Sequence, residues 1–594
     1  MSKKLFSLLI AFAFVHFTFT SCNDILNPDD EEEQQEETTT PDNEETIAEA
    51  EANNGLIHDD PTDYIWNSSD VIQVLLNGTS VSENSEKVTV EGQTVTIISA
   101  GSFSFSGSLN NGQIVVNTED DALVRLILNG VEITSSNSAP VYIKSASKAI
   151  VYLEENTNNT LTDGSSYIYD DTEKEEPNAT IFSKSNLTFF GSGTLTVNAN
   201  FNDAINCKDG IIISGGTYTL KALDDGIRGK DYLIVKSGTF DVVAGGDGFK
   251  SDNDEDESEG YINIVDGTFT IAAKGDAIAA ETDLMVTTGN FNLISGGGSS
   301  GSISATASAK GLKAGVNIIV DGGTFNINSA DDAIHSNETI AVNGGDFVLE
   351  SKDDGIHADY DLTINDGDID IKKSYEGLES ANGNITINKG TIHLVSSDDG
   401  INISGGGDSM GGRPGQMGGT TSSGNYFLYI NGGYTFVNAS GDGLDSNGSI
   451  TMTGGTVIVN GPTNNGNGAL DYDGTFKLTG GFLVAAGSSG MAQAPGTSST
   501  QYIVAAVFSS TKQAGTLVNI QTSDGKEMLT FKPEKTFQSL VFSSPDLTKG
   551  SSYDFNLGGS STGTVADGVY TNGTYTVGSK YSSFTISGIV TVVR

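Results

Sequence analysis

The chain has 594 residues, 74 glycines, 10 prolines and a formal net charge of −47 at pH 7. This excess of carboxylates argues against nucleic acid as a partner, because phosphate backbones select surfaces rich in lysine and arginine. Only 36% of the residues are hydrophobic, so we expect an elongated fold with a thin core, and an acidic surface suited to metal cations.

The N-terminus has the pattern of a secretory signal peptide, predicted over residues 1–21. Lys3 and Lys4 precede the apolar run LFSLLIAFAFVHFTF, which is too short to be a convincing membrane span. The following Thr20-Ser21-Cys22 resembles the lipobox of bacterial lipoproteins, so we expect Cys22 to be the lipidated first residue of the mature chain. The alternative is an ordinary signal peptide with an incidental cysteine.

Residues 22–60 are predicted to be an acidic, disordered tether, since they hold too few apolar side chains to fold. An acidic run after a lipidated cysteine resembles the surface-export signal of some Gram-negative lipoproteins. We therefore expect a lipid-anchored protein at the cell surface, on the outer membrane. Cys207 remains as a single cysteine, which leaves no intramolecular disulfide framework.

From about residue 200 the sequence repeats with a period of about 22 residues. The repeat is marked by an acidic residue, with an apolar residue two positions later and a small residue four positions later. The marking positions are Asp203, Asp225, Asp247, Asp276, Lys310, Asp332, Asp354, Glu376, Asp399 and Asp442. Cys207 falls in the small-residue column, so we interpret it as structural.

Each repeat has room for about three short strands separated by turns, with a glycine thirteen positions after most of the marking residues. Such a coil predicts an all-β fold, a right-handed parallel β-helix of roughly 22-residue coils, over residues 61–500. The period is lost after about residue 500. Residues 501–594 are predicted to form a C-terminal β cap or a small β domain, because a solenoid needs covered ends.

Equivalent residues of successive coils stack, so the repeat predicts columns of carboxylates. Like charges about 5 Å apart are costly unless a cation or protons neutralise them, and Ca²⁺ accepts six to eight oxygen ligands in flexible geometry. The alternative is that each aspartate accepts backbone N–H bonds in its own turn. The predicted metal ligands are Asp331, Asp332, Asp353, Asp354, Glu376, Asp398, Asp399, Asp442 and Asp445.

A second group of polar residues is predicted to contact carbohydrate: Lys208, Arg228, Lys230, Lys250, His335 and His357. The two histidines occupy the same offset in neighbouring repeats, where a metal pair is conceivable and two stacked, half-exposed rings are the simpler interpretation. The lysines could hold an anionic or hydroxyl-rich polymer, or could neutralise neighbouring Asp209 and Asp231.

Several segments resemble one known family: LILNGVEITSSNSAPVYI, the DDGI repeats, GGDGFKSDND, GNGALDYDG and VFSSPDLTKGSSYDFNLGG. The chain from about Trp66 to about Val592 is similar to secreted, calcium-binding parallel β-helix proteins with a carbohydrate-binding domain, related in shape to pectate lyases. The resemblance implies binding of plant-type polysaccharides, including acidic ones, with calcium at the Asp-rich turns.

The repeats are also similar to the calcium motif of one pectate lyase family, but only Asp442-Gly443-Leu444-Asp445 keeps the later aspartate, and Gly441 replaces the first. Our first hypothesis is therefore a surface protein that binds polysaccharide without cleaving it. The alternatives are a calcium-dependent polysaccharide lyase, with its base among Arg228, Lys250, Lys310 and Lys313, and a structural adhesin.

Overall fold

The computed structural model describes residues 46–169, 175–405 and 426–594, within the compact unit Glu44–Arg594. The predicted signal peptide, Cys22 and residues 22–45 of the predicted tether lie outside this part. The described part is all-β, and its helical elements are α1 (Ile47–Asn53), η1 (Pro61–Tyr64) and η2 (Ser68–Asp70). It contains no helix with the length and hydropathy needed to cross a bilayer.

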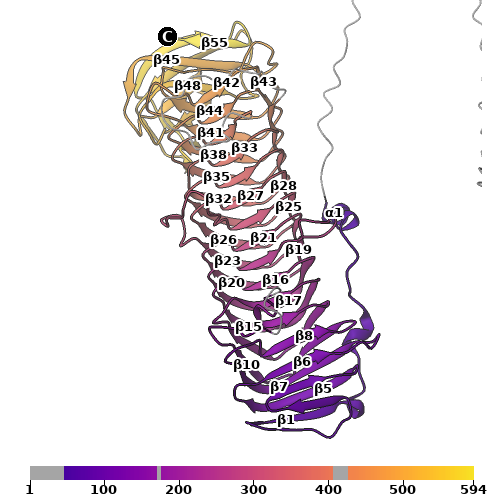
Figure 1. The fold of residues 1–594 in the computed structure, drawn as a ribbon. Helices are drawn as coiled ribbons and strands as arrows, with labels where there is room; N and C mark the ends of the chain where they lie inside the picture. The colour runs from indigo at the N-terminus through magenta and orange to yellow at the C-terminus, as the bar shows by residue number, and fades with distance from the viewer. Residues whose placement is uncertain (1–45, 170–174, 406–425) are drawn as a thin grey trace, which may run out of the picture. The chain divides into compact units, whose positions relative to one another are not determined.

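Each repeat contributes three strands, and each strand pairs in parallel with its equivalent one repeat later. In one repeat these are β27 (Ile334–Ser336), β28 (Thr339–Val342) and β29 (Asp346–Ser351). They pair with β30 (Ile356–Ala358), β31 (Leu362–Ile364) and β32 (Asp368–Ser374) of the next repeat, so that the coils stack in a regular series (Figure 1). The apolar residues of the repeat coincide in register, as Ile334 does with Ile356 and then Leu378.

The short strands that carry the acidic repeat belong to a 16-stranded sheet among the described residues, which also contains earlier strands. They are β3 (Val88–Glu91), β4 (Thr94–Ile97), β6 (Gln113–Asn117), β8 (Val141–Ser145), β11 (Ala179–Ser183), β14 (Asp203–Cys207), β16 (Ile227–Gly229), β18 (Phe249–Ser251), β21 (Ile278–Ala280), β24 (Leu312–Ala314), β27, β30 (Ile356–Ala358), β33 (Leu378–Ser380), β36 (Ile401–Ile403), β39 (Leu444–Ser446) and β42 (Leu470–Tyr472).

The other two strands of each repeat belong to a 31-stranded sheet, again counted over the described residues. It contains β1 (Ile72–Gly78), β2 (Val81–Ser82), β5 (Gly101–Leu109), β7 (Val124–Thr134), β9 (Ala149–Leu153), β10 (Asn158–Thr162), β12 (Leu187–Gly191), β13 (Thr194–Asn198), β15 (Ile211–Lys221), β17 (Tyr232–Ala244), β19 (Tyr261–Ile264), β20 (Thr268–Ala273), β22 (Leu284–Val286), β23 (Asn290–Ser295), β25 (Asn317–Val320), β26 (Thr324–Ser329), β28, β29, β31 (Leu362–Ile364), β32 (Asp368–Ser374), β34 (Ile385–Ile387), β35 (Thr391–Ser396), β37 (Phe427–Ile430), β38 (Tyr434–Ala439), β40 (Ser449–Met452), β41 (Thr456–Asn460), β43 (Phe476–Leu478), β44 (Phe482–Gly487), β45 (Ile503–Lys512), β48 (Phe537–Ser543) and β55 (Val590–Val593).

The core between the sheets is built from ladders of identical or similar side chains. Phe269, Phe291, Phe325 and Phe347 stack with ring centroids 4.6–4.7 Å apart and with nearly parallel planes. The preceding turn brings backbones close together: a Cβ on Gly323 (φ +114°) would lie 2.9 Å from the carbonyl oxygen of Gly289. Glycine is therefore required there, because both the left-handed φ and the close approach exclude a side chain.

Antiparallel strands replace the parallel pattern at both ends. At the first coils β1 pairs with β2, and β3 pairs with β4. At the last coil β44 pairs with β48, which pairs in turn with β45. The remaining strands form a six-stranded sheet of β46 (Val518–Thr522), β47 (Glu527–Phe531), β49 (Ser552–Leu557), β51 (Thr564–Ala566), β52 (Val569–Thr571) and β54 (Ser579–Thr585), and a pair of β50 (Ser560–Ser561) and β53 (Tyr575–Thr576).

The segment 46–66, which we call the strap, lies against the outer face of the large sheet. Ala50 of α1 packs with Ile212, Met285 and Ile319, and the backbone N–H of His58 donates a 2.8 Å hydrogen bond to the Tyr232 hydroxyl. The prediction that disorder extends to residue 60 is therefore wrong for residues 46–60. The apolar surface that orders this segment belongs to strands far away in the sequence, so local composition does not reveal it.

Candidate functional site

In most repeats one carboxylate bonds to the next coil. Oδ1 of Asp332 accepts a 3.0 Å hydrogen bond from the backbone N–H of Asp354, and Oδ1 of Asp354 accepts one of 2.9 Å from the N–H of Glu376. We call this series the aspartate ladder, and its acceptors are Asp203, Asp225, Asp247, Asp276, Asp332, Asp354, Asp399 and Asp442. The aspartates thus do accept backbone N–H bonds, but between neighbouring coils and not within one turn.

The residue three positions after each ladder position forms a second series, the central column. Its members pair in register along the 16-stranded sheet, and their charge changes from basic, through two histidines, to acidic. In order they are Asn206, Arg228, Lys250, Ala279, Lys313, His335, His357, Glu379, Asn402, Asp445 and Asp471. Because most members follow a ladder carboxylate while their own side chains differ, the chemistry of the surface changes from coil to coil.

In the basic third of the column, the predicted carbohydrate ligands are paired with acids. Arg228 contacts Asp252, and Lys250 Nζ lies 2.7 Å from Asp247 Oδ2. The nearby Lys230 lies 3.2 Å from Glu255, and Lys208 lies 3.7 Å from Glu176. Lys208 and Lys230 therefore form ion pairs with Glu176 and Glu255, and Asp231, one of the two expected acids, adds a smaller charge interaction with Lys230.

A lysine already occupies the first predicted metal cluster. Asp331, Asp332 and Asp353 do come together, but Lys310 Nζ lies 2.9 Å from Asp331 Oδ2 and 2.7 Å from Asp332 Oδ2. Burial alone would raise the pKa of Asp332, yet Lys310 and His335 hold that pKa far below its usual value. This protein cation reduces the need for a metal ion at these three carboxylates.

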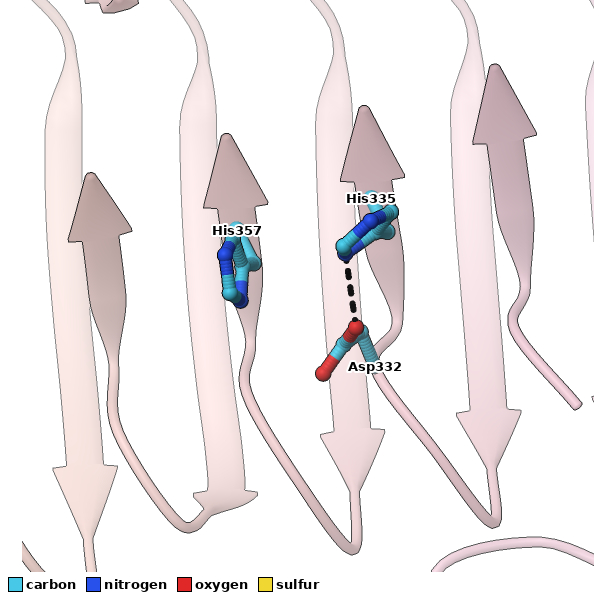
Figure 2. Close-up of side chains that lie close together, drawn as sticks. All are labelled: Asp332, His335 and His357. Atoms are coloured by element: carbon cyan, nitrogen blue, oxygen red, sulfur yellow. Dashed lines mark ion pairs between the residues drawn. The ribbon is translucent and has the colours of Figure 1, made fainter. Parts of the chain in front are cut away.

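The middle of the column places both histidines among buried carboxylates, and the sequence prediction missed Glu379 there. His335 Nδ1 lies 2.9 Å from Asp332 Oδ2, and His357 Nδ1 lies 2.9 Å from Glu379 Oε2 and 3.2 Å from Asp354 Oδ2. Figure 2 shows the two rings side by side on adjacent strands, on the same side of the sheet. Glu379 occupies, in the next repeat, the position that His335 and His357 have in theirs. The repeat spacing in the sequence could therefore have identified it.

The acidic end of the column holds an all-oxygen cluster. Asp399, Asp442 and Asp445 each offer a carboxylate oxygen within 4.8 Å of the others. Burial, followed by the charges of Asp399 and Asp442, raises the pKa of Asp445 to about 8. In the described part of the chain Asp442 and Asp445 form no ion pair with a lysine, arginine or histidine, so this cluster has the oxygen-only chemistry that calcium prefers.

The outer column, defined as Asp331, Asp353, Tyr375 and Asp398, runs beside the aspartate ladder. Backbone hydrogen bonds join its successive members. The N–H of Tyr375 donates to the Asp353 carbonyl (2.8 Å), and the N–H of Asp398 donates to the Tyr375 carbonyl (2.9 Å). Tyr375 is 44% exposed and replaces an aspartate at this position. The column therefore presents acids and one aromatic ring to solvent at regular intervals.

A family model described as "Carbohydrate-binding domain-containing protein" matches residues 91–355 and 349–468. A protein of the same description from Acetivibrio thermocellus is 42% identical over 147 residues, which is 25% of this chain and 48% of that protein. The chain thus matches about half the length of this curated relative. A solved structure, "polysaccharide lyase-like protein from C. thermocellum, Gadolinium derivative", is 36% identical, with a TM-score of 0.37, and the match covers 38% of this chain and 92% of that one.

Proposed function

The chain belongs to the family of carbohydrate-binding domain-containing proteins, and from this premise we propose that it is a cell-surface lipoprotein that binds polysaccharide without cleaving it. We infer that its stacked coils form a right-handed parallel β-helix, stabilised by calcium and held at the outer membrane through Cys22. The family match lies on the coils, so the coils are where we place the polysaccharide.

The observation that carries this proposal is the outer column. Neighbouring coils are about 4.8 Å apart, the spacing of paired strands, which is of the order of the length of one sugar residue. Asp353 and Asp398 offer hydrogen-bond acceptors on either side of Tyr375. An exposed tyrosine ring gives a flat apolar surface with a polar edge, which suits one face of a pyranose ring.

The protonation state of the lysines that could serve as the base of a lyase supports binding without cleavage. A general base must lose its proton near the working pH. Burial works against the charge of Lys250 and Lys310, but the surrounding aspartates outweigh it and raise both pKa values above the usual range for lysine. These two residues are therefore held protonated, which is the wrong state for removing a proton from a uronate.

Calcium fits best at Asp399, Asp442 and Asp445. These residues supply only oxygen donors, and burial followed by the charges of Asp399 and Asp442 raises the pKa of Asp445, a cost that a divalent cation would reduce. A calcium ion there could also bridge to the carboxylate of an acidic sugar.

The test is a pull-down of the protein with pectin and polygalacturonate, with and without calcium, together with the absorbance of unsaturated products. We expect binding, no absorbance increase, and about tenfold weaker binding for Tyr375→Ala, equivalent to roughly 1.4 kcal/mol. Tyr360→Ala is the matched control, because Tyr360 is 52% exposed and lies outside the outer column. Calcium-dependent release of unsaturated products would place the protein among the lyases, and absence of binding would favour an adhesin.

The anchor is tested separately on intact cells. Added protease should remove the protein, and Cys22→Ala should release it from the membrane fraction. A Cys22→Ala protein that stays fully membrane-bound would contradict the lipidation.

A further inference from the structure

We propose that Asp332, His335 and His357 form a binding site for a divalent transition-metal ion of the zinc class, separate from the oxygen-only cluster at Asp399, Asp442 and Asp445. Each of the three residues offers one ligand atom, and these atoms lie within 4.8 Å of one another. The histidines come from adjacent strands, β27 and β30, with ring centroids 4.8 Å apart (Figure 2). Small side-chain movements would bring the three atoms onto one ion.

The hydrogen bonds of the two rings indicate which nitrogen atoms could bind the ion. His335 Nε2 lies 3.1 Å from the amide oxygen of Asn337, which can only accept. This contact places a proton on Nε2, so in the neutral ring the lone pair is on Nδ1. His357 Nδ1 lies 2.9 Å from Glu379 Oε2 and therefore carries a proton. Burial opposes the charge of His357, but hydrogen bonds to Asp354, Asp359 and Glu379 raise its pKa, so a metal ion at Nε2 must displace a second proton. Metal-bound histidines are commonly oriented by such a bond from the other ring nitrogen.

The two remaining nitrogens are buried and make no hydrogen bond to the described residues. His335 Nδ1 lies 2.9 Å from Asp332 Oδ2, which makes an ion pair when the ring is protonated. When the ring is neutral and carries its proton on Nε2, Nδ1 and the carboxylate oxygen are both acceptors, and a metal ion can take the place that the proton has in the ion pair. His357 Nε2 similarly lies 3.4 Å from Asp359 Oδ1, an exposed carboxylate that could reach the same ion.

The surrounding charge also favours a cation. Asp332, Asp354, Glu376 and Glu379 are 3–7% exposed. Burial, followed by Glu379 and Asp354, raises the pKa of Glu376 to about 10, so this carboxyl group takes up a proton when no further cation is present. A divalent ion would compensate part of this charge.

The donor set selects the class of metal. Imidazole nitrogen together with carboxylate oxygen suits Zn²⁺, Ni²⁺ and Cu²⁺, whereas Ca²⁺ prefers oxygen ligands alone. Three protein ligands leave a fourth position for water or for Asp359. Lys310 competes with the metal ion for Asp332, since its Nζ lies 2.7 Å from Asp332 Oδ2. The same Nζ lies 2.9 Å from Asp331 Oδ2, so Lys310 can keep its ion pair with Asp331 when a metal ion binds Asp332.

The test is calorimetric titration of the chelator-treated full chain with ZnCl₂ alone and with CaCl₂ alone, combined with the visible spectrum of Co²⁺ added in place of Zn²⁺. We expect one Zn²⁺ bound through these residues, intense tetrahedral Co²⁺ bands, and at least about 100-fold weaker binding for His335→Gln or His357→Gln. The matched control is His393→Gln, because His393 pairs with Asp567 away from this cluster.

Two further variants separate this proposal from the calcium proposal and from misfolding. Lys310→Met should tighten Zn²⁺ binding, a gain that a misfolded protein cannot give. Asp445→Asn should leave Zn²⁺ binding unchanged. The proposal is overturned if the wild-type chain binds no Zn²⁺, if either histidine variant binds it as tightly as wild type, or if Ca²⁺ displaces Co²⁺ from the site at equal concentration.

Discussion

At the scale of single residues, the aspartate ladder explains why an acid is tolerated at buried positions of this fold. Asp203 is fully buried, yet its Oδ1 accepts the N–H of Asp225 at 3.1 Å and its Oδ2 accepts from Asn206 at 2.6 Å. A buried N–H left without a partner costs about 1–3 kcal/mol. The ladder therefore satisfies a backbone group that would otherwise be unpaired in the turn.

We predict that Asp203→Ala lowers the free energy of unfolding by about 1–3 kcal/mol, whereas Asp203→Asn has little effect because the amide oxygen still accepts the hydrogen bond.

The same residue makes stability depend on pH. Burial and the charge of Asp225 raise the pKa of Asp203 to about 7, so the folded state binds more protons than the unfolded state. Stability therefore falls as the pH rises from about 4 to about 7. Above pH 7 the asparagine variant should match or exceed wild type in urea denaturation. Asp241→Ala, at an exposed position, is the control; equal losses for the Ala and Asn variants at Asp203 would exclude the ladder role.

Calcium binding at the acidic end is also a prediction at the residue scale. Addition of Ca²⁺ to the chelated protein should raise its melting temperature, corresponding to roughly 2.7 kcal/mol at a hundred times the dissociation constant. Asp445→Asn should reduce this response, while Asp241→Asn should not. Melting curves that do not change with calcium would exclude a stabilising site.

The sequence predicted which of these residues lie close together, because a strict period converts spacing into contact. Asp332 and Asp354 lie next to each other because they are 22 residues apart, which is the length of one coil. The spacing placed Lys310 in the same column as Asp332 but did not show which carboxylates its side chain contacts. Its Nζ lies close to Asp331 and Asp332, so at these residues a lysine supplies the positive charge that we had assigned to calcium. Side-chain reach between coils decides this, and the period does not specify it.

At the scale of elements, the strap depends on one neutral histidine. His58 Nδ1 lies 2.6 Å from the Tyr232 hydroxyl and Nε2 lies 2.8 Å from the Thr188 hydroxyl. Burial, followed by the charge of Lys148, lowers the pKa of His58 from 6.5 to about 4. The charged groups around the ring are Lys148, Lys236 and Asp59.

We predict that the strap loosens as the pH falls. The unfolded segment takes up a proton below about pH 6.5 and the packed one only below about pH 4, so the stability that neutral His58 gives is present above the first value and lost through this window. The loss is at most about 3 kcal/mol for a shift of this size. Protease sensitivity of residues 46–66 should therefore increase between about pH 7 and about pH 4 in wild type and change less in His58→Gln. Identical pH dependence of the two proteins would contradict this role.

At the scale of the whole molecule, the sequence predicted an all-β chain and the register of its repeats, because apolar and small residues recur at fixed offsets. It could not predict which segments cover the outer faces. Phe436, Ile458 and Val484 point away from the coils and pack with residues after 500, such as Phe542 and Phe555. Those contacts join strands with no common period, so no repeat in the sequence marks them.

The C-terminal strands therefore have a testable role as a cover. β44 would have an unpaired edge without β48, and unpaired edges join other chains; Phe436, Ile458 and Val484 would be exposed at the same time. We predict that a chain ending at residue 502 keeps the β content of its coils but self-associates in sedimentation velocity, while the full chain does not. Val484→Lys in the shortened chain should reduce this association, because a charge on an edge strand opposes pairing. A shortened chain that stays monomeric with an unchanged melting temperature would show that the last coil needs no cover.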